Sequence, residues 1–587
     1  MANLNIFHYQ SKNFRWTNED ESVSIRLIAK KGYLSEAKVI YGAKKYNSPL
    51  LESEPMKIEL ENDSIQVFES TLKLKDDRRF TYAFKVKLAE DNKEGYFFSD
   101  GLHALNENKD PIDNFFQICH IFDSEETIIP SIARKKGAVI QIFPDRFAIG
   151  DYSKPCMKDV NLKVGDKPNS HSFFGGDFKG IEDHLQYLKD LGITTIYLTP
   201  IFKSSSNHRY DVEDYLKIDD RLGGEKGFKE LVDRIHSNGI SIVLDGVFNH
   251  TSYKNDMFQD VIENGKESKY FDFYYCDGKP DFNKKNYLTF GSAGYMPKLR
   301  TENPKVIEFG CKVLNTITSK YNIDGWRFDV ADEVAHVFWI NVHQTLRSIN
   351  PSILMIGEDW MASENYLEGN QFDGVMNYQF RKIAIELIAN EIINARTARE
   401  RLIDLLARYS WNNDLSMFNL ISSHDTPRFK TLAEGNEDKT LLATLLAVSY
   451  PGMFMSYYGD ELGMEGGSDP LNRAPIDWNS LDKNKEFQNT YKSILSLKQL
   501  DEFITGRIKI ETCKDLLIIK RYIDEKKSYK VLLNTRKDYI DLNEDIDEVV
   551  IEHNYDKSKN RLSSYGYIVI KNKSKGLLQN PDPKSGE

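Results

Sequence analysis

Eight short apolar runs between residues 138 and 460 constrain the fold of this chain more than any other feature. The runs are 138–143, 194–202, 241–249, 325–330, 354–359, 372–378, 417–425 and 452–460. Most are separated by amphipathic helical patterns, such as 181–192 and 228–239. Strands that are apolar on both faces and alternate with such helices indicate a parallel sheet covered by helices. Eight repeats over roughly 350 residues predict a (β/α)8 TIM barrel, an α/β fold, with insertions.

Two connections depart from this repeat. The link from the third to the fourth run is too long for one helix, which predicts an inserted subdomain at 251–305. The stretch after the fifth run, 361–371, is too short for a full helix. We therefore expect a barrel with one large insertion and one missing helix.

Strand patterns flank the barrel on both sides. Residues 1–125 alternate apolar and polar positions between short polar breaks, which predicts an N-terminal β-sandwich of about seven strands. The barrel is assigned to 126–490. Residues 491–587 carry strand-like runs after one helix, which predicts a small C-terminal β-domain.

Charge and cysteine content exclude several functions. The chain has 78 Lys and Arg against 89 Asp and Glu, a net charge of −11, with the two signs interspersed. Nucleic-acid binding needs a concentrated basic face, so we expect no nucleic-acid partner. The five cysteines show no CxxC spacing, which argues against a zinc site or a disulfide framework. Without an apolar leader or an apolar run of transmembrane length, we expect a cytoplasmic protein and no membrane partner.

Polar side chains gather at the carboxyl ends of the predicted barrel strands, where active sites of such barrels form. They are Tyr210 after strand two, Asp245 and His250 at strand three, Arg327 and Asp329 at strand four, Glu358 at strand five, and His424 and Asp425 at strand seven. Each of them alone has a structural explanation, such as an ion pair inside the barrel. Their convergence on one face predicts a catalytic site.

Asp329 and Glu358 are the candidates for a catalytic pair. They end consecutive strands, which lie about 4.8 Å apart, and a retaining glycosidase needs its two carboxyl groups about 5–5.5 Å apart. Arg327 points to the same side of its strand as Asp329, and we expect it to lower the pKa of that carboxyl by about one to three units. Burial and the nearby charges of Asp329 and Asp425 are expected to raise the pKa of Glu358, as suits a proton donor.

A metal-dependent hydrolase is the alternative on the same barrel. Such enzymes commonly carry paired histidines at the end of the first strand. Residues 138–145 contain no histidine, and His208, His250 and His424 each stand alone. The glycosidase hypothesis is therefore favoured.

Four motifs, in order, resemble the conserved regions of the α-amylase family, glycoside hydrolase family 13. They are DGVFNH at 245–250, DGWRFDVADE at 324–333, GEDW at 357–360 and SSHDTPR at 422–428. Other segments, such as MPKLRTENPKV at 296–306, are similar to the cyclomaltodextrinase, neopullulanase and maltogenic amylase branch of this family. The N-terminal region resembles carbohydrate-binding module family 34, whose members pack across a partner subunit's barrel, and this resemblance implies a homodimer.

The resemblance implies a role for each matching residue. Asp329 is the expected nucleophile, Glu358 the general acid/base and Asp425 the third catalytic carboxylate. The expected substrate-binding residues are Tyr210, His250, Arg327, Glu333, Trp360, His424, Asp469 and Arg473. Glu333 stands where typical α-amylases have a Lys-His pair, which implies some transglycosylation.

A calcium site is frequent in this branch after the first barrel strand, in a loop similar to NGDxxND. The loop here reads IGDYSKP at 149–155, so Ile149 and Lys154 replace oxygen donors. Calcium takes six to eight oxygen ligands. We therefore expect this calcium site to be absent, with no metal and no cofactor in the protein.

The resulting hypothesis is a retaining hydrolase of α-1,4 bonds in cyclodextrins, pullulan or maltooligosaccharides. The alternatives are an exo-acting α-glucosidase on short oligosaccharides, a starch-degrading α-amylase and a catalytically silent glucan-binding protein. An exo-acting enzyme needs a chain end, which a cyclodextrin lacks. Silent relatives typically lack the nucleophile or the acid, whereas all three carboxylates stand here.

Overall fold

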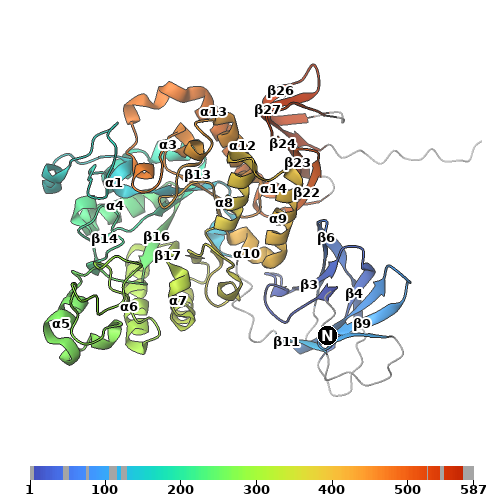
Figure 1. Ribbon diagram of the computed structural model, residues 1–587, viewed down its shortest axis with the longest axis horizontal. Helices are drawn as coiled ribbons and strands as arrows, with labels where there is room; N and C mark the ends of the chain where they lie inside the picture. The colour runs from blue at the N-terminus through green and yellow to red at the C-terminus, as the bar shows by residue number, and fades with distance from the viewer. Residues whose placement is uncertain are drawn as a thin grey trace, which may run out of the picture.

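Eight parallel strands form a closed barrel at the centre of the molecule (Figure 1). The computed structural model describes residues 5–43, 52–73, 79–104, 115–119, 129–524, 527–542, 546 and 548–572. The barrel strands follow one another in chain order: β12 (Ala138–Ile142), β13 (Ile193–Leu198), β16 (Ser241–Val247), β17 (Gly325–Asp329), β18 (Leu354–Gly357), β19 (Gly374–Val375), β20 (Phe418–Leu420) and β21 (Met453–Tyr457). β21 pairs with β12, and a bridge between Met376 and Phe418 closes the ring. The predicted TIM barrel is confirmed.

Helices cover the outside of the barrel. They include α3 (Leu185–Leu191), α4 (Gly224–Ser237), α6 (Pro304–Tyr321), α7 (His336–Ile349), α9 (Ala395–Arg408), α12 (Glu437–Ser449) and α13 (Lys485–Ser496). α6 shows why these segments are helical: Asn303 caps the backbone N–H of Lys305, Pro304 follows at the first turn, and the helix ends at Asn322 with a φ of 54°. After β18 the chain forms only the short 3-10 helix Glu364–Tyr366, so the missing helix is confirmed.

The connection between β16 and β17 carries the inserted segment. It contains α5 (Asp256–Asn264) and short antiparallel bridges that join Tyr274 to Leu299 and Cys276 to Tyr287. A further bridge joins His250, just after β16, to Lys298, which binds the insertion to the end of a barrel strand. The insertion therefore stands beside the strand ends that carry the site. The domain limits at 125, 251–305 and 490 stay predictions.

The N-terminal domain contains two antiparallel sheets. One contains β1 (Ile6–Phe7), β2 (Arg15–Thr17), β3 (Val23–Lys30), β6 (Lys57–Glu61) and β7 (Ile65–Leu72). The other contains β4 (Leu34–Ala43), β5 (Glu52–Pro55), β8 (Arg79–Leu88), β9 (Glu94–Phe98), β10 (Gly101–Ala104) and β11 (Phe116–Cys119). The described residues thus form more strands than the seven expected, because five of them have four residues or fewer, too few to show an alternation.

The C-terminal domain is one antiparallel sheet beside the barrel. Its strands are β22 (Arg507–Cys513), β23 (Leu516–Tyr522), β24 (Ser528–Asn534), β25 (Ile540–Asp541), β26 (Glu548–Asp556) and β27 (Arg561–Lys571). Both β6 of the N-terminal domain and β22 contact α9, so the two outer domains lie on the same side of the barrel (Figure 1). Nowhere in the described ranges does a helix have the length and apolarity needed to cross a bilayer.

Candidate active site

A cavity of about 490 Å³ opens at the carboxyl ends of the barrel strands. Most of the predicted site residues line it: Tyr210, His250, Asp329, Glu333, Glu358, Trp360, Asp425, Asp469 and Arg473. The other two, Arg327 and His424, are fully buried behind the wall and contact the lining carboxylates. All the predicted residues therefore meet in one place, while their individual roles stay predictions.

Arg327 is the centre of this arrangement. Its Nη1 donates to both carboxylate oxygens of Asp245, at 2.9 and 3.0 Å, and to Oδ1 of Asp329 at 2.9 Å. Its Nη2 forms ion pairs with Oε2 of Glu358 at 2.7 Å and Oδ2 of Asp425 at 3.9 Å. The register of the barrel strands explains the contact between Arg327 and Asp245, because Asp245 on β16 pairs directly with Arg327 on β17. One guanidinium thus contacts acids from four strand ends.

Negative charge exceeds positive charge in this cluster, and the pKa values reflect it. Burial is the main cause of the raised pKa of Asp329, and Arg327 only partly opposes it. The charges of Glu358, Asp245 and Asp425 raise it further. Burial and the Glu358 charge also raise the pKa of Asp425 to about 7. Arg327 does lower the pKa of Asp329, but burial and the charges of three further acids outweigh it, so the expected net lowering of this pKa is wrong.

Glu358 is held by groups on both of its oxygens. Oε2 accepts a hydrogen bond from the backbone N–H of Val330 at 3.0 Å, and Oε1 accepts one from the indole N–H of Trp360 at 3.1 Å. Val330 has a φ of 45°, a left-handed conformation that is unfavourable for a β-branched residue. The strained turn directly after Asp329 therefore directs a backbone donor to Glu358. Trp360 stacks on Tyr378 with ring centroids 3.9 Å apart, at the rim of the pocket.

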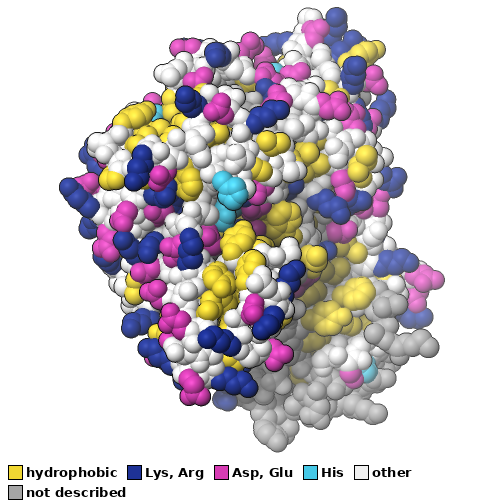
Figure 2. Space-filling view, turned by 60° about the vertical axis from the view of Figure 1, so that its left-hand side comes forward, with side chains coloured by type: hydrophobic (Ala, Val, Ile, Leu, Met, Phe, Trp, Pro, Cys, Tyr) yellow, Lys and Arg dark blue, Asp and Glu magenta, His cyan; other side chains and the backbone are white. Residues whose placement is uncertain are grey.

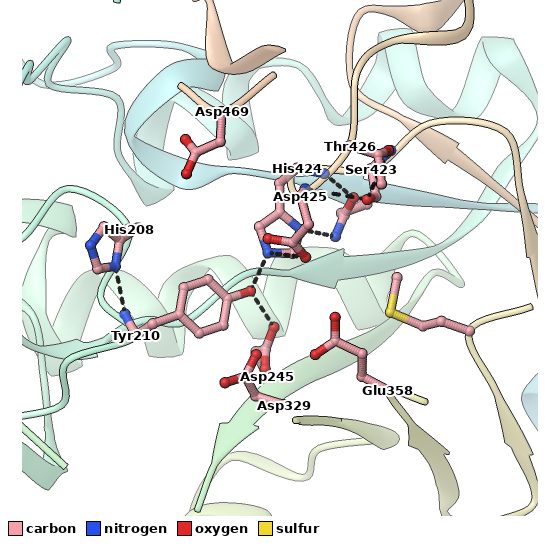
Figure 3. A network of polar contacts seen from close by, with 12 residues as sticks. His208, Tyr210, Asp245, Asp329, Glu358, Ser423, His424, Asp425, Thr426 and Asp469 are labelled. Carbon is pink, nitrogen blue, oxygen red and sulfur yellow. Dashed lines mark hydrogen bonds and ion pairs between the residues drawn. The ribbon is translucent and has the colours of Figure 1, made fainter. Parts of the chain in front are cut away.

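His424 and Tyr210 form the next layer, and the close-up shows them among the acidic residues Asp245, Asp329, Glu358 and Asp425 (Figure 3). Their rings are parallel at 5.4 Å, and the Tyr210 hydroxyl donates to Oδ2 of Asp245 at 2.9 Å. Gln141 donates from Nε2 to Nδ1 of His424 at 2.7 Å. Burial lowers the pKa of His424 far below its usual value, so the ring is neutral. With Nδ1 accepting, the network assigns the proton to Nε2, which lies 3.1 Å from Asp425.

His250 presents a free nitrogen in the wall. Its ring stacks on Phe290 of the insertion at 5.1 Å, and burial lowers its pKa to about 3. Among the residues that the structure describes, Nε2 of His250 has no hydrogen-bond partner although it is buried. A buried polar atom without a partner is costly unless a ligand satisfies it, so this nitrogen fits a ligand hydroxyl.

Two ion pairs lie at the rim. Arg473 contacts Asp469 at 2.9 Å and reaches Asp425 at 3.5 Å. Glu333 pairs with Lys298 of the insertion at 2.6 Å. The edge of the pocket thus carries charged side chains from three separate chain segments.

Several lining residues escaped the sequence prediction. They are His208, Phe290, Ala293, Tyr295, Met296, Val330 and Asp332. Phe290, Tyr295 and Met296 come from the insertion, whose aromatic content was the available signal. The supporting residue Gln141 also escaped, although one polar residue in the apolar run 138–143 marks it. A second cavity of about 700 Å³ shares His208 and Tyr295 with the first. Hydrophobic side chains gather beside a hollow on one face of the molecule (Figure 2).

The fold and the site define a TIM-barrel enzyme with a cluster of carboxyl groups at the ends of its barrel strands. Residues 141–566 match the family described as alpha amylase, catalytic domain, and residues 1–121 match the alpha amylase N-terminal ig-like domain. The chain belongs to the α-amylase family, is a glycoside hydrolase of the cyclomaltodextrinase and neopullulanase type, and its class of activity is α-glucan hydrolysis.

Relatives cover most of the chain. It is 37% identical to neopullulanase 2 of Thermoactinomyces vulgaris over 510 residues, 86% of each protein. It is 35% identical to the intracellular maltogenic amylase of Bacillus subtilis over 457 residues, 76% of each. A solved cyclomaltodextrinase structure superposes with a TM-score of 0.87 at 31% identity, covering 97% of this chain and all of the other.

Proposed function

We propose that this enzyme is a retaining hydrolase of α-1,4-glucosidic bonds in cyclodextrins, pullulan or maltooligosaccharides. The observation that carries the proposal is that Asp329 and Glu358 contact the two terminal nitrogens of one guanidinium, at 2.9 and 2.7 Å. They follow adjacent paired strands, β17 and β18. This arrangement supports the short carboxyl spacing of retaining enzymes over the wider spacing that an inverting enzyme needs for its water.

In the first step, the carboxylate of Asp329 attacks the anomeric carbon while Glu358 gives its proton to the departing glycosidic oxygen. A glycosyl ester forms and the old glycosidic bond breaks. In the second step, Glu358 takes a proton from water, and the oxygen of that water displaces Asp329. Positive charge develops on the sugar ring in both transition states, and the excess of carboxylate around Arg327 stabilises it.

The walls support a glucan ligand. Aromatic side chains offer flat faces for sugar rings, and Trp360 and Tyr295 are each about half exposed at the pocket. The unpartnered Nε2 of His250 suits a sugar hydroxyl. The adjoining cavity beyond His208 has room for further sugar units. Glu333 and Lys298 at the rim would bind an acceptor hydroxyl, which supports transglycosylation as a side reaction.

Digestion of β-cyclodextrin, pullulan and soluble starch side by side tests the substrate class. We expect ring opening of β-cyclodextrin to be the fastest reaction, with linear products seen by chromatography. Inert cyclodextrin with release of glucose from chain ends would establish the exo-acting alternative, and fast attack on starch alone would establish an ordinary α-amylase. Proton NMR of the first products tests retention: the α-anomer appears first, and initial β-anomer would contradict it.

We also propose that the enzyme acts as a homodimer in the cytoplasm. The name of the intracellular Bacillus subtilis relative supports the location, and the N-terminal domain supports the dimer. Sedimentation equilibrium should give twice the chain mass of 67.9 kDa. A monomer at micromolar concentration contradicts this proposal and leaves the catalytic one untouched.

A further inference from the structure

Lys154 is a buried lysine outside the catalytic pocket, just before the 3-10 helix Pro155–Asp159. Its Nζ lies 2.5 Å from Oδ2 of Asp177, 3.0 Å from the carbonyl oxygen of Gly175 and 3.2 Å from that of Arg221. An ammonium group has three N–H donors, and here each has one oxygen acceptor. The three oxygens come from two segments far from Lys154 in the chain.

Besides Lys154, the carboxylate of Asp177 contacts three backbone N–H groups. It caps α2 (Phe178–Asp183), because its Oδ1 accepts from the backbone N–H of Gly180 at 2.7 Å. The same oxygen accepts from the N–H of Gly150 at 3.0 Å, and Oδ2 accepts from that of Asp151 at 3.0 Å. A single carboxylate therefore joins the 150–154 loop to the start of α2, and its negative charge is balanced by Lys154.

Calcium does not fit among these oxygens. The family resemblance places a calcium ion at this loop, and such an ion needs six to eight oxygen ligands at 2.3–2.6 Å. The Lys154 ammonium already contacts Asp177 and two carbonyl oxygens, which are the hard oxygen donors that a cation would use. Two cations in one cage would repel each other across a few ångströms of low-dielectric protein.

We propose that the ammonium group of Lys154 is a covalently tethered replacement for a structural calcium ion. The native protein thereby takes its cation from its own chain and is stable without added metal. Removal of the lysine side chain leaves Asp177 and the carbonyls of Gly175 and Arg221 without their cation, and converts the loop into a site that binds Ca²⁺.

The contact also supports one wall of the pocket. Ser172, three residues before Gly175, accepts on its carbonyl oxygen from Nδ2 of Asn207 at 2.8 Å. Asn207 precedes His208, which lines the catalytic cavity. The position of the His208 wall therefore depends on the segment that Lys154 holds, although Lys154 itself contacts no part of the pocket lining.

Thermal unfolding with and without Ca²⁺ tests the proposal, and its readout does not depend on the proposed activity. The variants are Lys154→Asn, which adds an oxygen donor in place of the cation, and Lys154→Met, which adds none. Lys158→Asn is the matched control, because Lys158 is exposed on the same 3-10 helix. Each protein is melted in EDTA and in 5 mM CaCl2, with 5 mM MgCl2 for comparison.

We expect the Tm of the native protein and of Lys158→Asn to be the same in both buffers to about 1 °C. Lys154→Asn and Lys154→Met in EDTA should melt about 5 °C lower, because a buried carboxylate has lost its partner. Ca²⁺ should restore at least half of this loss in Lys154→Asn and much less in Lys154→Met. If Lys154→Asn does not fold in EDTA, soluble yield with and without CaCl2 replaces Tm as the readout.

Two results would overturn the proposal. One is a native protein that loses stability in EDTA and regains it with Ca²⁺, since calcium would then bind despite the lysine. The other is a Lys154→Asn variant whose stability and soluble yield do not depend on Ca²⁺, since the lysine would then not replace a bound cation. Calorimetric titration of the native protein with CaCl2 checks the first result independently.

Discussion

Arg26 and Arg327 are both completely buried, yet they meet different amounts of negative charge. Arg26, on β3, contacts one carboxylate, Glu69, with Nε and Nη2 at 2.9 and 2.7 Å. Its Nη1 donates to the carbonyl oxygens of Leu406, Ala407 and Tyr409 at the carboxyl end of α9. Arg327 instead meets four carboxyl groups and no carbonyl among its described hydrogen bonds.

The acidic partners respond in opposite directions. Burial alone raises the pKa of Glu69, but the charges of Arg26 and Arg507 outweigh it, and the pKa falls below its usual value. The pKa of Asp329 is raised, because one arginine cannot balance burial and three further acids. The Arg26 pair is a balanced contact that joins the N-terminal domain to the barrel. In the Arg327 cluster four acidic groups surround one arginine, and we expect this surplus of acids to favour a cationic transition state over stability.

The largest expected effect is the loss of activity in Asp329→Asn, which should separate activity from stability. Removing the proposed nucleophile is expected to lower kcat by about 10⁴-fold or more, while the Tm stays at or above that of the native protein because one crowded acid is gone. Steady-state hydrolysis and thermal unfolding measure the two effects. Asp332→Asn is the control, since Asp332 lies on the same rim and is exposed. Activity of Asp329→Asn within tenfold of the native enzyme would refute the nucleophile assignment.

Arg26→Met should show the reverse pattern. Glu69 keeps only Arg507 as a donor, and three carbonyl oxygens lose the guanidinium, so we expect the free energy of unfolding to fall by about 3–5 kcal/mol. The kcat of the folded enzyme should change by less than about twofold, because neither Arg26 nor its hydrogen-bond partners line the catalytic pocket. The midpoint of urea unfolding measures the loss, and Arg26→Met/Glu69→Gln should recover part of it. An unchanged midpoint would show that this pair does not hold the domain.

The effect of Asp425→Asn on stability should be the smallest and should depend on pH. The folded-state pKa of Asp425 is about 7, above the usual 3.8, so the folded protein binds its proton more tightly than the unfolded chain. Stability from this proton is complete below about pH 4 and is lost as the pH rises through 7. The variant has no carboxyl group at this position and does not lose this stability as the pH rises. The Tm of the variant minus the Tm of the native protein should therefore increase by a few degrees between pH 5 and pH 8. A difference that is constant with pH would contradict the raised pKa.

Local patterns in the sequence account for the parts of the site that single elements carry. Strand ends place Asp245, Arg327 and Glu358 at one edge of a barrel, and the spacing of Arg327 and Asp329 puts both on the inner side. The same patterns did not predict the aromatic residues that the insertion contributes to the pocket, because that segment lacks the repeat of strands and helices seen in the barrel. They also missed the five shortest strands of the N-terminal domain, which have too few residues to show an alternation of apolar and polar side chains.

The order of strands, the barrel and the face that carries the acids were determined by the sequence itself, because hydrophobic periodicity and strand-end chemistry are local properties. The number of acids around Arg327, and hence the direction of the Asp329 pKa, was decided only by the closed barrel, which brings Asp425 to within 3.9 Å of that arginine from nearly one hundred positions away. Lys154 is a second example: the sequence predicted a lost calcium ligand, and the replacement that we propose rests on the packing of Gly175, Asp177 and Arg221 around its ammonium. Charge balance in a protein interior depends on which distant segments meet there, and that is settled by tertiary packing.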